Sequence, residues 1–147
     1  MKKLLPVVVV VLALVGVLLL SLPTILHKAG LHPEYHGPKV ELLGKRALVI
    51  TTSHDVLAAR GETDGPATGV VASELTHPYY VFLDGGMQVD VASIKGGKIP
   101  VAPDSLSRIS ATPETTRFLQ DQIFKAKVDK SIKIDDVDFT DYDIIFL

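Results

Sequence analysis

The stretch RALVITTS, residues 46–53, decides the fold, because it is a short apolar run rich in β-branched side chains with charged and polar neighbours. Such a run is typical of a strand that is buried on both faces of a parallel sheet. A polar loop follows it, and residues 67–84 then show the apolar spacing of a helix that ends at Gly85 and Gly86. MQVDVAS, residues 87–93, predicts a second strand.

The C-terminal part continues this alternation. The segment TPE, residues 112–114, is typical of a helix start, with a hydroxyl N-cap, a proline at the first helical position and then an acid. We expect this helix to run to about residue 126 and an irregular polar segment to follow over residues 131–140. YDIIFL, residues 142–147, predicts a third strand, so that residues 45–147 form an α/β domain.

The run YDIIFL also carries an expectation about the extent of the domain. It is the most apolar stretch outside the N-terminal segment, and a central parallel strand must be covered on both faces. We therefore expect further strands and helices to belong after Leu147, and residues 45–147 to be the truncated front of a larger α/β domain.

The N-terminal segment predicts a membrane anchor. Residues 4–26 contain no charged side chain and consist mostly of Val and Leu, and a helix of roughly 20 apolar residues crosses the hydrocarbon core of a bilayer. A cleaved signal peptide is the alternative, because Lys2 and Lys3 form a basic start. The apolar run is long for a signal, and no small-x-small cleavage site precedes Lys28. We therefore favour an uncleaved transmembrane helix over residues 1–26, with the lipid bilayer as its partner.

The charges around this segment suggest an orientation. Lys2, Lys3 and the amino terminus precede the apolar run, and Lys28 and Lys39 follow it. The positive-inside rule then favours a cytoplasmic N-terminus. We expect a single-pass membrane protein whose soluble domain lies outside the cytoplasm.

Residues 27–44 contain several prolines and glycines and predict a linker or stalk. His32, Glu34 and His36 alternate within it, so an extended backbone would place them on one face. Two histidines and a carboxylate could hold a metal ion, but nothing in the sequence orders this segment. We favour a solvated linker, and we expect neither a metal nor another cofactor.

Composition narrows the classes of function. The net charge is −2, from 15 basic and 17 acidic residues, so the sequence lacks the basic excess of a nucleic-acid-binding domain. The chain contains no cysteine. Disulfides, thiolate metal sites and a thiol nucleophile are therefore excluded within these residues.

Glu74 has an unexpected position on its predicted helix. On a wheel of about 100° per residue that starts at Val70, Glu74 lies between Val70 and Pro78, in an apolar stripe that also holds Phe82. Burying an ionised carboxylate without a partner costs on the order of several kcal/mol, so carboxylates in such places are candidate functional groups. The alternative is that Glu74 lies at the edge of the stripe and reaches water. Pro78 would break the helical hydrogen-bond ladder beside the acid.

Three further groups have a functional and a plainer interpretation. His77 lies near the stripe and either lines a site or caps the interruption at Pro78. Hydroxyls of residues 51–54 follow the first strand, where open α/β sheets bind ligands, but the glycines of a phosphate loop are absent and we favour an ordinary polar loop. The aspartates of residues 135–143 lack EF-hand spacing and are interpreted as a solvated cluster.

Several of these segments together carry a resemblance to a known family. TGVVASELTHPYYVFLDGG at residues 68–86, QVDVAS, GGKIPVAPDS and DYDIIFL resemble the N-terminal half of the ThiJ/PfpI superfamily, which has the class I glutamine amidotransferase-like fold. The chaperone and glyoxalase III branch is the most similar, and the resemblance covers residues 45–147. It implies a flavodoxin-like sandwich, with helices on both sides of a parallel sheet. In this sequence the sandwich is incomplete, and one transmembrane helix precedes it.

The resemblance also implies a mechanism. Family members use a cysteine nucleophile on a strand-to-helix elbow, a histidine after it, and a glutamate from the first helix that contacts the cysteine. Glu74 matches that glutamate by motif and would hold a proton and polarise the thiol. Because the chain ends before the cysteine strand of the family, we expect no such catalysis from these residues alone.

Two functions of different classes follow from this resemblance. The first is a membrane-anchored enzyme of the glyoxalase III, deglycase or hydrolase class. When complete, it would need no cofactor and would act on a small dicarbonyl or a related substrate. Glu74 would be its supporting acid, and His77 is a further candidate catalytic residue. The second is a holdase chaperone or binding protein without chemistry. Members of the family often dimerise, so a second copy of the chain is a candidate partner, and nucleic acid is not.

Overall fold

The computed structural model describes residues 4–30, 37, 38 and 40–147. The chain divides into two compact units, Met1–His36 and Gly37–Leu147, and each is described by itself. The predicted His32, Glu34 and His36 metal site lies outside the described residues.

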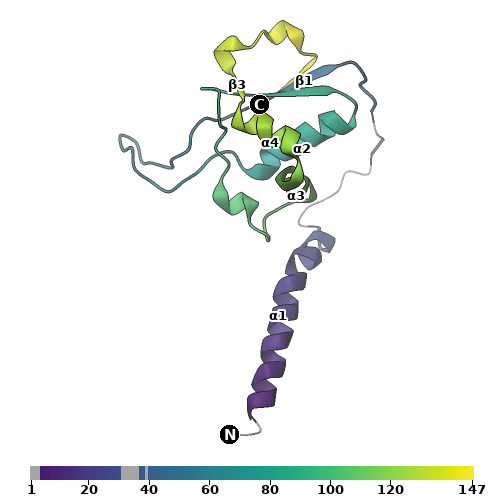
Figure 1. The fold of residues 1–147 in the computed structure, drawn as a ribbon, viewed down its shortest axis with the longest axis vertical. Helices are drawn as coiled ribbons and strands as arrows, with labels where there is room; N and C mark the ends of the chain where they lie inside the picture. Colours follow the sequence, from purple (N-terminus) through teal and green to yellow (C-terminus); the bar gives the residue numbers. More distant parts are fainter. Residues whose placement is uncertain (1–3, 31–36, 39) are drawn as a thin grey trace. The chain divides into compact units, whose positions relative to one another are not determined.

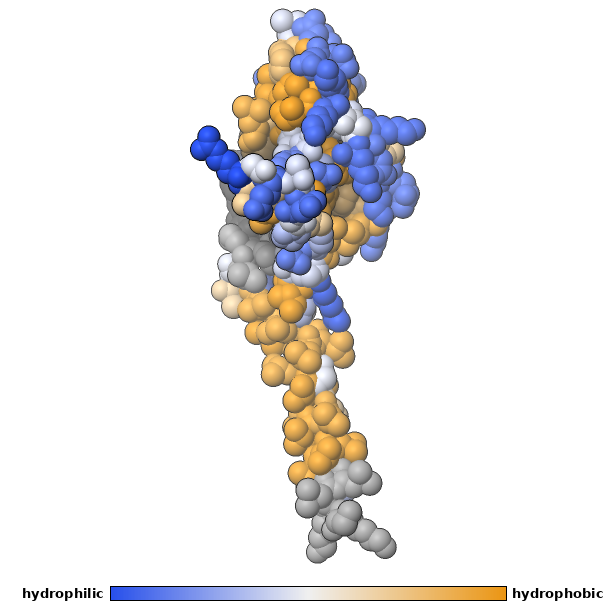
Figure 2. Space-filling view, turned by 90° about the vertical axis from the view of Figure 1, so that its left-hand side faces the viewer, coloured by the Kyte–Doolittle hydropathy of each residue, from blue (hydrophilic) through white to orange (hydrophobic). Residues whose placement is uncertain are grey.

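The first unit contains helix α1, Leu4–Lys28. Its segment Pro6–Lys28 has a mean hydropathy of 2.8, and by length and composition it could cross a membrane. Figure 2 shows apolar side chains along the visible face of this helix. The apolar helix predicted over residues 4–26 is therefore present and extends to Lys28.

The second unit is built on a parallel sheet of four strands, in the order β3-β2-β1-β4 (Figure 1). β1, Arg46–Thr51, pairs with β2, Gln88–Ser93, on one edge and with β4, Ile144–Phe146, on the other. β3 is the short pair Ile132–Lys133 beside β2. The α/β class and the three predicted strands are confirmed.

The two faces of this sheet are covered differently (Figure 1). Helices α2 (Ala72–Asp84), α3 (Pro113–Gln120) and α4 (Gln122–Asp129) pack on one face, over a core that includes Val49, Val91 and Phe124. On the other face, Leu48 and Ile50 pack against residues 132–142, which contain the short 3₁₀ helices η2 (Ile134–Asp136) and η3 (Phe139–Asp141). Within the described residues, helices α2–α4 cover one face and the short η2 and η3 lie over the other, so the second unit is the incomplete flavodoxin-like sandwich that the resemblance implied.

Two predicted helix boundaries are wrong for physical reasons. α2 begins at Ala72 instead of residue 67, because Ala67 and Val70 form β-bridges with Val56 and Val101. The helix predicted to run to about residue 126 is two helices, α3 and α4. Asp121 separates them in an extended conformation, and its carboxylate accepts a hydrogen bond from the amide of Phe124 as the N-cap of α4.

Asp90 on β2 joins several elements through one carboxylate. It accepts hydrogen bonds from Arg46 Nη2 at 3.0 Å and from the Tyr142 hydroxyl at 3.2 Å, and Lys127 Nζ lies 3.4 Å away. Burial raises the pKa of Asp90, but the hydrogen bonds of Arg46, Tyr142 and Lys127 together with the Lys127 charge outweigh it and hold the pKa below its usual value. This carboxylate therefore links β1, β2 and α4 with the segment that leads into β4.

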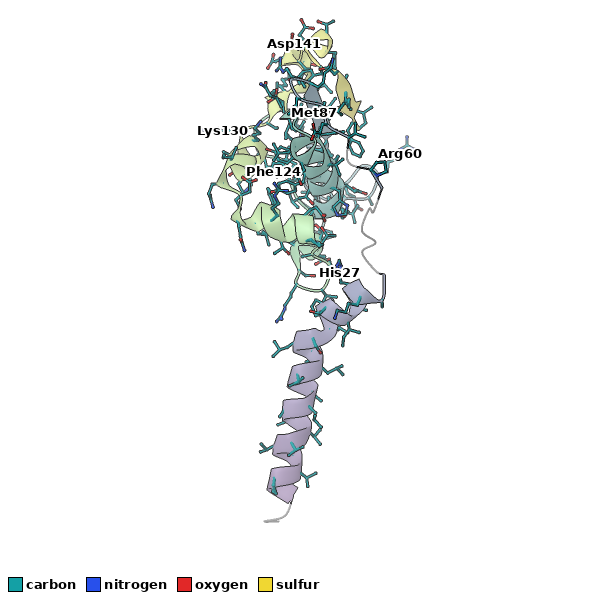
Figure 3. All side chains as sticks on the ribbon, turned by 90° about the vertical axis from the view of Figure 1, so that its right-hand side faces the viewer. His27, Arg60, Met87, Phe124, Lys130 and Asp141 are labelled. Atoms are coloured by element: carbon teal, nitrogen blue, oxygen red, sulfur yellow. The ribbon has the colours of Figure 1, made fainter. Side chains whose placement is uncertain are left out.

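Aromatic side chains form the centre of the helical layer. Phe124 of α4 is completely buried, stacks on Tyr79 of α2 with ring centroids 3.4 Å apart, and meets Tyr80 and Phe118 edge-on. Figure 3 labels Phe124 on α4. Because this ring contacts both α2 and α3, it holds the three helices together.

We predict that Phe124→Ala lowers the free energy of unfolding by about 3–5 kcal/mol, since it removes a fully buried ring and leaves a cavity. Chemical denaturation of the full chain in detergent, followed by near-ultraviolet circular dichroism, measures the change. The adjacent Ile123 is 73% exposed, so Ile123→Ala serves as the control and should change stability by no more than about 0.5 kcal/mol. Equal effects of the two substitutions would show that the aromatic cluster does not hold the helical layer.

Candidate functional site

A pocket of about 650 Å³ lies where β1 and β4 end and α2 begins. This is the edge of the sheet at which open α/β folds bind ligands. Its polar lining side chains are Thr51, Thr52, Ser73, Glu74 and His77. Its other lining residues are Val49, Ile50, Gly69, Val70, Pro78, Phe146 and Leu147.

The first turn of α2 is held in place from a distant part of the chain. Its N-cap residue, Val71, has no side-chain oxygen, and the Ser105 hydroxyl instead accepts a hydrogen bond from the amide of Ala72 at 2.9 Å. Ser105 lies on the 3₁₀ helix η1, Pro103–Leu106. The Pro-Asp-Ser segment that contributed to the family resemblance therefore fixes the start of the helix that carries Glu74.

Backbone hydrogen bonds fix the residues just before α2. The amide of Val70 donates to the Pro100 carbonyl, and the amide of Ala102 donates to the Val70 carbonyl, each at 2.9 Å. At Gly69 the two segments approach so closely that an added Cβ would lie 2.2 Å from the Pro100 oxygen. Glycine is therefore required at this position of the pocket wall.

The structure places Glu74 in the pocket but not in a buried stripe. Glu74 is exposed, and the buried face of α2 consists of Ala72, Leu75, Thr76, Tyr79 and Tyr80. The predicted apolar stripe was wrong because Val70 lies outside the helix and the buried residues of α2 lie on a different face from Glu74. The alternative interpretation is the correct one, because the Glu74 side chain is exposed to water.

Pro78 lies inside α2, one turn after Glu74, and both residues line the pocket. Proline has no N–H group, so the backbone carbonyl of Glu74 lacks the hydrogen-bond donor that residue i+4 of a helix normally supplies. The helix continues through Pro78 to Asp84. Glu74 therefore lines the pocket, and its backbone carbonyl has no i+4 amide donor within α2.

His77 connects the pocket to α3. Its Nε2 lies 2.8 Å from Glu114 Oε2 and 3.2 Å from the Thr112 hydroxyl. Thr112 also accepts a hydrogen bond from the amide of Thr115, so it is the N-cap that the sequence predicted for this helix. Sequence reasoning identified His77 and the acid at position 114 separately, and the packing of α2 against α3 brings them together.

The hydroxyl loop after β1 has mixed roles. Thr51 and Thr52 line the pocket, whereas the Ser53 hydroxyl accepts a hydrogen bond from the amide of Lys95 and so ties the loop to the segment after β2. Thr52 also accepts a hydrogen bond from the amide of His54, as in an ordinary turn. The Thr51 hydroxyl is buried and has no hydrogen-bond partner within the described structure. No lysine or arginine is among the described residues that line the pocket.

The acidic cluster lies away from this pocket. Asp135 pairs with Lys133, and Asp143 accepts hydrogen bonds from Lys45 and from the amide of Arg46. Across residues 4–30, 37, 38 and 40–147, no group of three His, Asp or Glu side chains is placed to hold a metal ion. The aspartates at 135–143 therefore belong to surface ion pairs and turns.

The pocket offers a carboxylate, an imidazole and several hydroxyl groups. Carboxylates and imidazoles accept hydrogen bonds and transfer protons, and the 147 residues supply no thiol. The arrangement can bind and orient a small polar molecule and can exchange protons with it. Covalent chemistry through sulfur would require a cysteine from outside these residues.

Known structures share this fold. The chain is similar to the Rapid Encystment Protein 24 kDa of Francisella tularensis, with 39% sequence identity and a TM-score of 0.59 over 69% of this chain and 43% of that one. It is also similar to glyoxalase III of Candida albicans, with 26% identity and a TM-score of 0.56 over 69% of this chain and 41% of that one. A third crystal structure has 31% identity and a TM-score of 0.53.

The chain spans less than half the length of these solved structures. No protein-family model matches it, and no curated protein matches it. The similarity therefore comes from solved structures and covers 69–71% of this chain.

We predict that Gly69→Ala destabilises the fold by about 1–3 kcal/mol, because its Cβ would collide with the Pro100 carbonyl and separate the segments that position α2. Gly61→Ala is the comparison, since Gly61 has a φ of 88° but no atom within 4 Å of an added Cβ, and the conformational cost alone is about 1 kcal/mol. Hydrogen exchange at the amides of Val70 and Ala102 reports the local effect. Protection that is retained at both amides in Gly69→Ala would mean that the close approach does not fix this wall.

Proposed function

Since this chain belongs to the ThiJ/PfpI superfamily and carries the N-terminal half of its fold, we propose that it is a membrane-anchored protein of the glyoxalase III, deglycase or hydrolase class. The observation that carries the proposal is the position of Glu74 on the first turn of α2, in a pocket at the ends of β1 and β4. The substrate class is a small dicarbonyl or a related molecule.

Glu74 is the supporting acid in this proposal. A carboxyl group beside a thiol can hold a proton and increase the reactivity of the sulfur. Phe146 and Leu147 line the pocket and are 40% and 87% exposed, so a thiol carried by further residues could approach the carboxylate from their side. The thiol must come from outside the 147 residues, because they contain no cysteine.

The apolar segment Pro6–Lys28 supports the proposed anchor. It contains 23 residues, and about 20 residues are sufficient to span a bilayer. The lipid bilayer is the proposed partner of this segment. The basic residues before it favour a cytoplasmic N-terminus and a soluble domain on the opposite side.

A specific feature favours a second candidate, a holdase or binding protein without chemistry. The outer edge of β4 is unpaired in the described sheet, and the side chains of Ile145, Phe146 and Leu147 are 43%, 40% and 87% exposed. An apolar strand edge of this kind can add an extended segment of another polypeptide. A holdase would use this edge rather than Glu74.

We predict that Glu74→Gln lowers kcat/KM for methylglyoxal conversion by at least about 100-fold, because the amide cannot exchange a proton with the thiol. The assay uses the full chain fused after Leu147 to the part of the Candida albicans glyoxalase III that lies beyond the matched region. Glu62→Gln is the control, since Glu62 lies on the exposed loop outside the pocket lining and its loss should leave the rate unchanged.

An equal rate for Glu74→Gln and the unaltered fusion would remove Glu74 from the mechanism. Two results together would favour the holdase. The fusion would fold but show no activity, and the full chain would prevent aggregation of a denatured client protein both with and without Glu74→Gln.

We predict that the full chain remains in the membrane fraction after alkaline carbonate extraction, because the apolar helix is stable only within the hydrocarbon core. Replacing Leu12 and Val15, both exposed and apolar, by Arg should release the protein, at a cost of about 3 kcal/mol per charge. Protease added to intact cells should digest the soluble domain. A mature protein that begins after residue 26 would instead identify a cleaved signal peptide.

A further inference from the structure

We propose that a group of lysines docks the second unit on an anionic bilayer surface, with the exposed Ile94 lying between the lipid headgroups. The lysines are Lys95, Lys98, Lys130 and Lys133, which we call the lysine face. The ligand class is the phosphate group of an anionic phospholipid. The inference rests on the proposed membrane anchor and does not depend on the proposed enzyme class.

A backbone bridge brings the two lysine-bearing segments together. Gly97 and Ser131 form an antiparallel bridge in which the amide of each residue donates to the carbonyl of the other at 2.9 Å. The Ser131 hydroxyl also donates to the Gly97 carbonyl, at 2.7 Å. Lys98 follows Gly97 and Lys130 precedes Ser131, so the two lysines are neighbours across this antiparallel bridge.

A close approach of the backbone adds the other two lysines. A Cβ added at Gly96 would lie 2.9 Å from the Cβ of Lys133, and the φ of 71° at Gly96 favours glycine. Lys95 directly precedes this glycine, and its amide donates to the Ser53 hydroxyl at 2.8 Å. Backbone contacts therefore hold all four lysines on two adjoining segments, one after β2 and one that includes β3.

Three of these lysines have no carboxylate partner in the described part of the chain. Lys95, Lys98 and Lys130 are exposed, and no carboxylate oxygen of a described residue lies within 4.0 Å of their Nζ atoms. The fourth, Lys133, pairs with Asp135. Like charges on facing residues repel each other, so an anion from outside the chain would stabilise this arrangement.

The surrounding acids do not cancel this charge. Residues 94–98 and 129–135 contain the four lysines and two aspartates, Asp129 and Asp135. The two segments are therefore net positive, in a chain whose net charge is −2. A locally positive surface attracts the phosphate groups of anionic lipids.

The shape of the lysine face favours a bilayer over a single small anion. A Cβ added at Gly97 would have no atom within 4 Å in the described part of the chain, so the bridge between the lysines is open. Ile94, next to Lys95, is 54% exposed. Basic side chains beside an exposed apolar one are typical of segments that lie at a membrane interface. An open array of point charges therefore fits several headgroups at once.

The proposed anchor supplies the bilayer. α1 ends at Lys28 and the second unit begins at Gly37. The residues between them extend at most about 30 Å, so the second unit has a high effective concentration at the bilayer that α1 would span. A surface attraction that is weak for a free domain is then sufficient for docking.

Tryptophan fluorescence of the full chain in nanodiscs tests the docking. The chain contains no tryptophan, so the single indole of Ile94→Trp reports on the lysine face. Lipids with brominated acyl chains should quench it in discs that contain phosphatidylglycerol but not in discs of phosphatidylcholine alone. Ile123→Trp, at a position on α4 that is 73% exposed, is the control and should show no such difference. Raising the salt from about 0.1 M to about 1 M should abolish the quenching, because it shortens the screening length to about 3 Å.

Substitutions in the Ile94→Trp chain identify the charges that act. Lys95→Gln, Lys98→Gln and Lys130→Gln should each lower the ratio of docked to undocked domain about fivefold. Arg60→Gln removes the same charge from an exposed position and should leave this ratio unchanged. Figure 3 shows Arg60 and Lys130 on different sides of the second unit. An unchanged near-ultraviolet circular dichroism spectrum will show that each variant remains folded.

Quenching of Ile94→Trp that is equal in the two kinds of disc, or that the lysine substitutions do not change, overturns the proposal. Inorganic phosphate added to phosphatidylcholine discs should leave the emission of Ile94→Trp unaltered. A change as large as that caused by phosphatidylglycerol would identify a site for a single phosphate and overturn docking on a bilayer.

Failure of the anchor is a different result. A chain that does not purify with the nanodiscs would reject α1 as a transmembrane helix. The same chain mixed with phosphatidylglycerol vesicles then tests the lysine face by itself. Sedimentation with the vesicles that Lys98→Gln weakens would support the face, and a chain that stays in the supernatant would overturn it.

Discussion

Parallel pairing of β1 on both of its edges is the constraint on which the second unit depends. Its inner residues are buried, and it aligns β2 and β4 so that their carboxyl ends lie at one edge of the sheet. A strand in this position must be apolar on both faces, as the sequence ALVI at residues 47–50 is. The side chains that pack on the two faces of the sheet then determine where the helices and the pocket lie. The aromatic cluster of α2, α3 and α4 fixes the helical face, and Asp90 joins the strands at the other.

Features that depend on local sequence could be predicted. The β-branched run of β1, the N-cap and proline at the start of α3, and the apolar segment of α1 each express a short-range rule. The start of α2 could not be predicted, because Val70 has helical spacing but pairs with Val101 across a long loop. The interruption at Asp121, which divides the predicted helix into α3 and α4, could not be predicted either. An aspartate within a helical pattern does not reveal that it caps a second helix.

The candidate site shows the same division. Glu74 and His77 could be selected from sequence because they lie beside Pro78 and match a family motif. Their surroundings could not, since the exposure of Glu74 depends on where α2 begins and the partner of His77 lies on another helix. The orphan hydroxyl of Thr51 is also a result of packing. Sequence thus selected Glu74 and His77 as candidate groups, whereas tertiary structure determined what surrounds each of them.

The cap that Ser105 supplies to α2 has a consequence for the order of folding. The hydrogen bond joins residues separated by 33 positions in the chain, and the helix has no side-chain cap of its own. A nascent polypeptide whose synthesis has reached only Asp84 contains every residue of α2 but lacks the group that satisfies its first amide. Helix nucleation is the unfavourable step, so α2 gains its full stability only after the ribosome has released Ser105. The pocket is therefore assembled late, by a contact that closes a long loop.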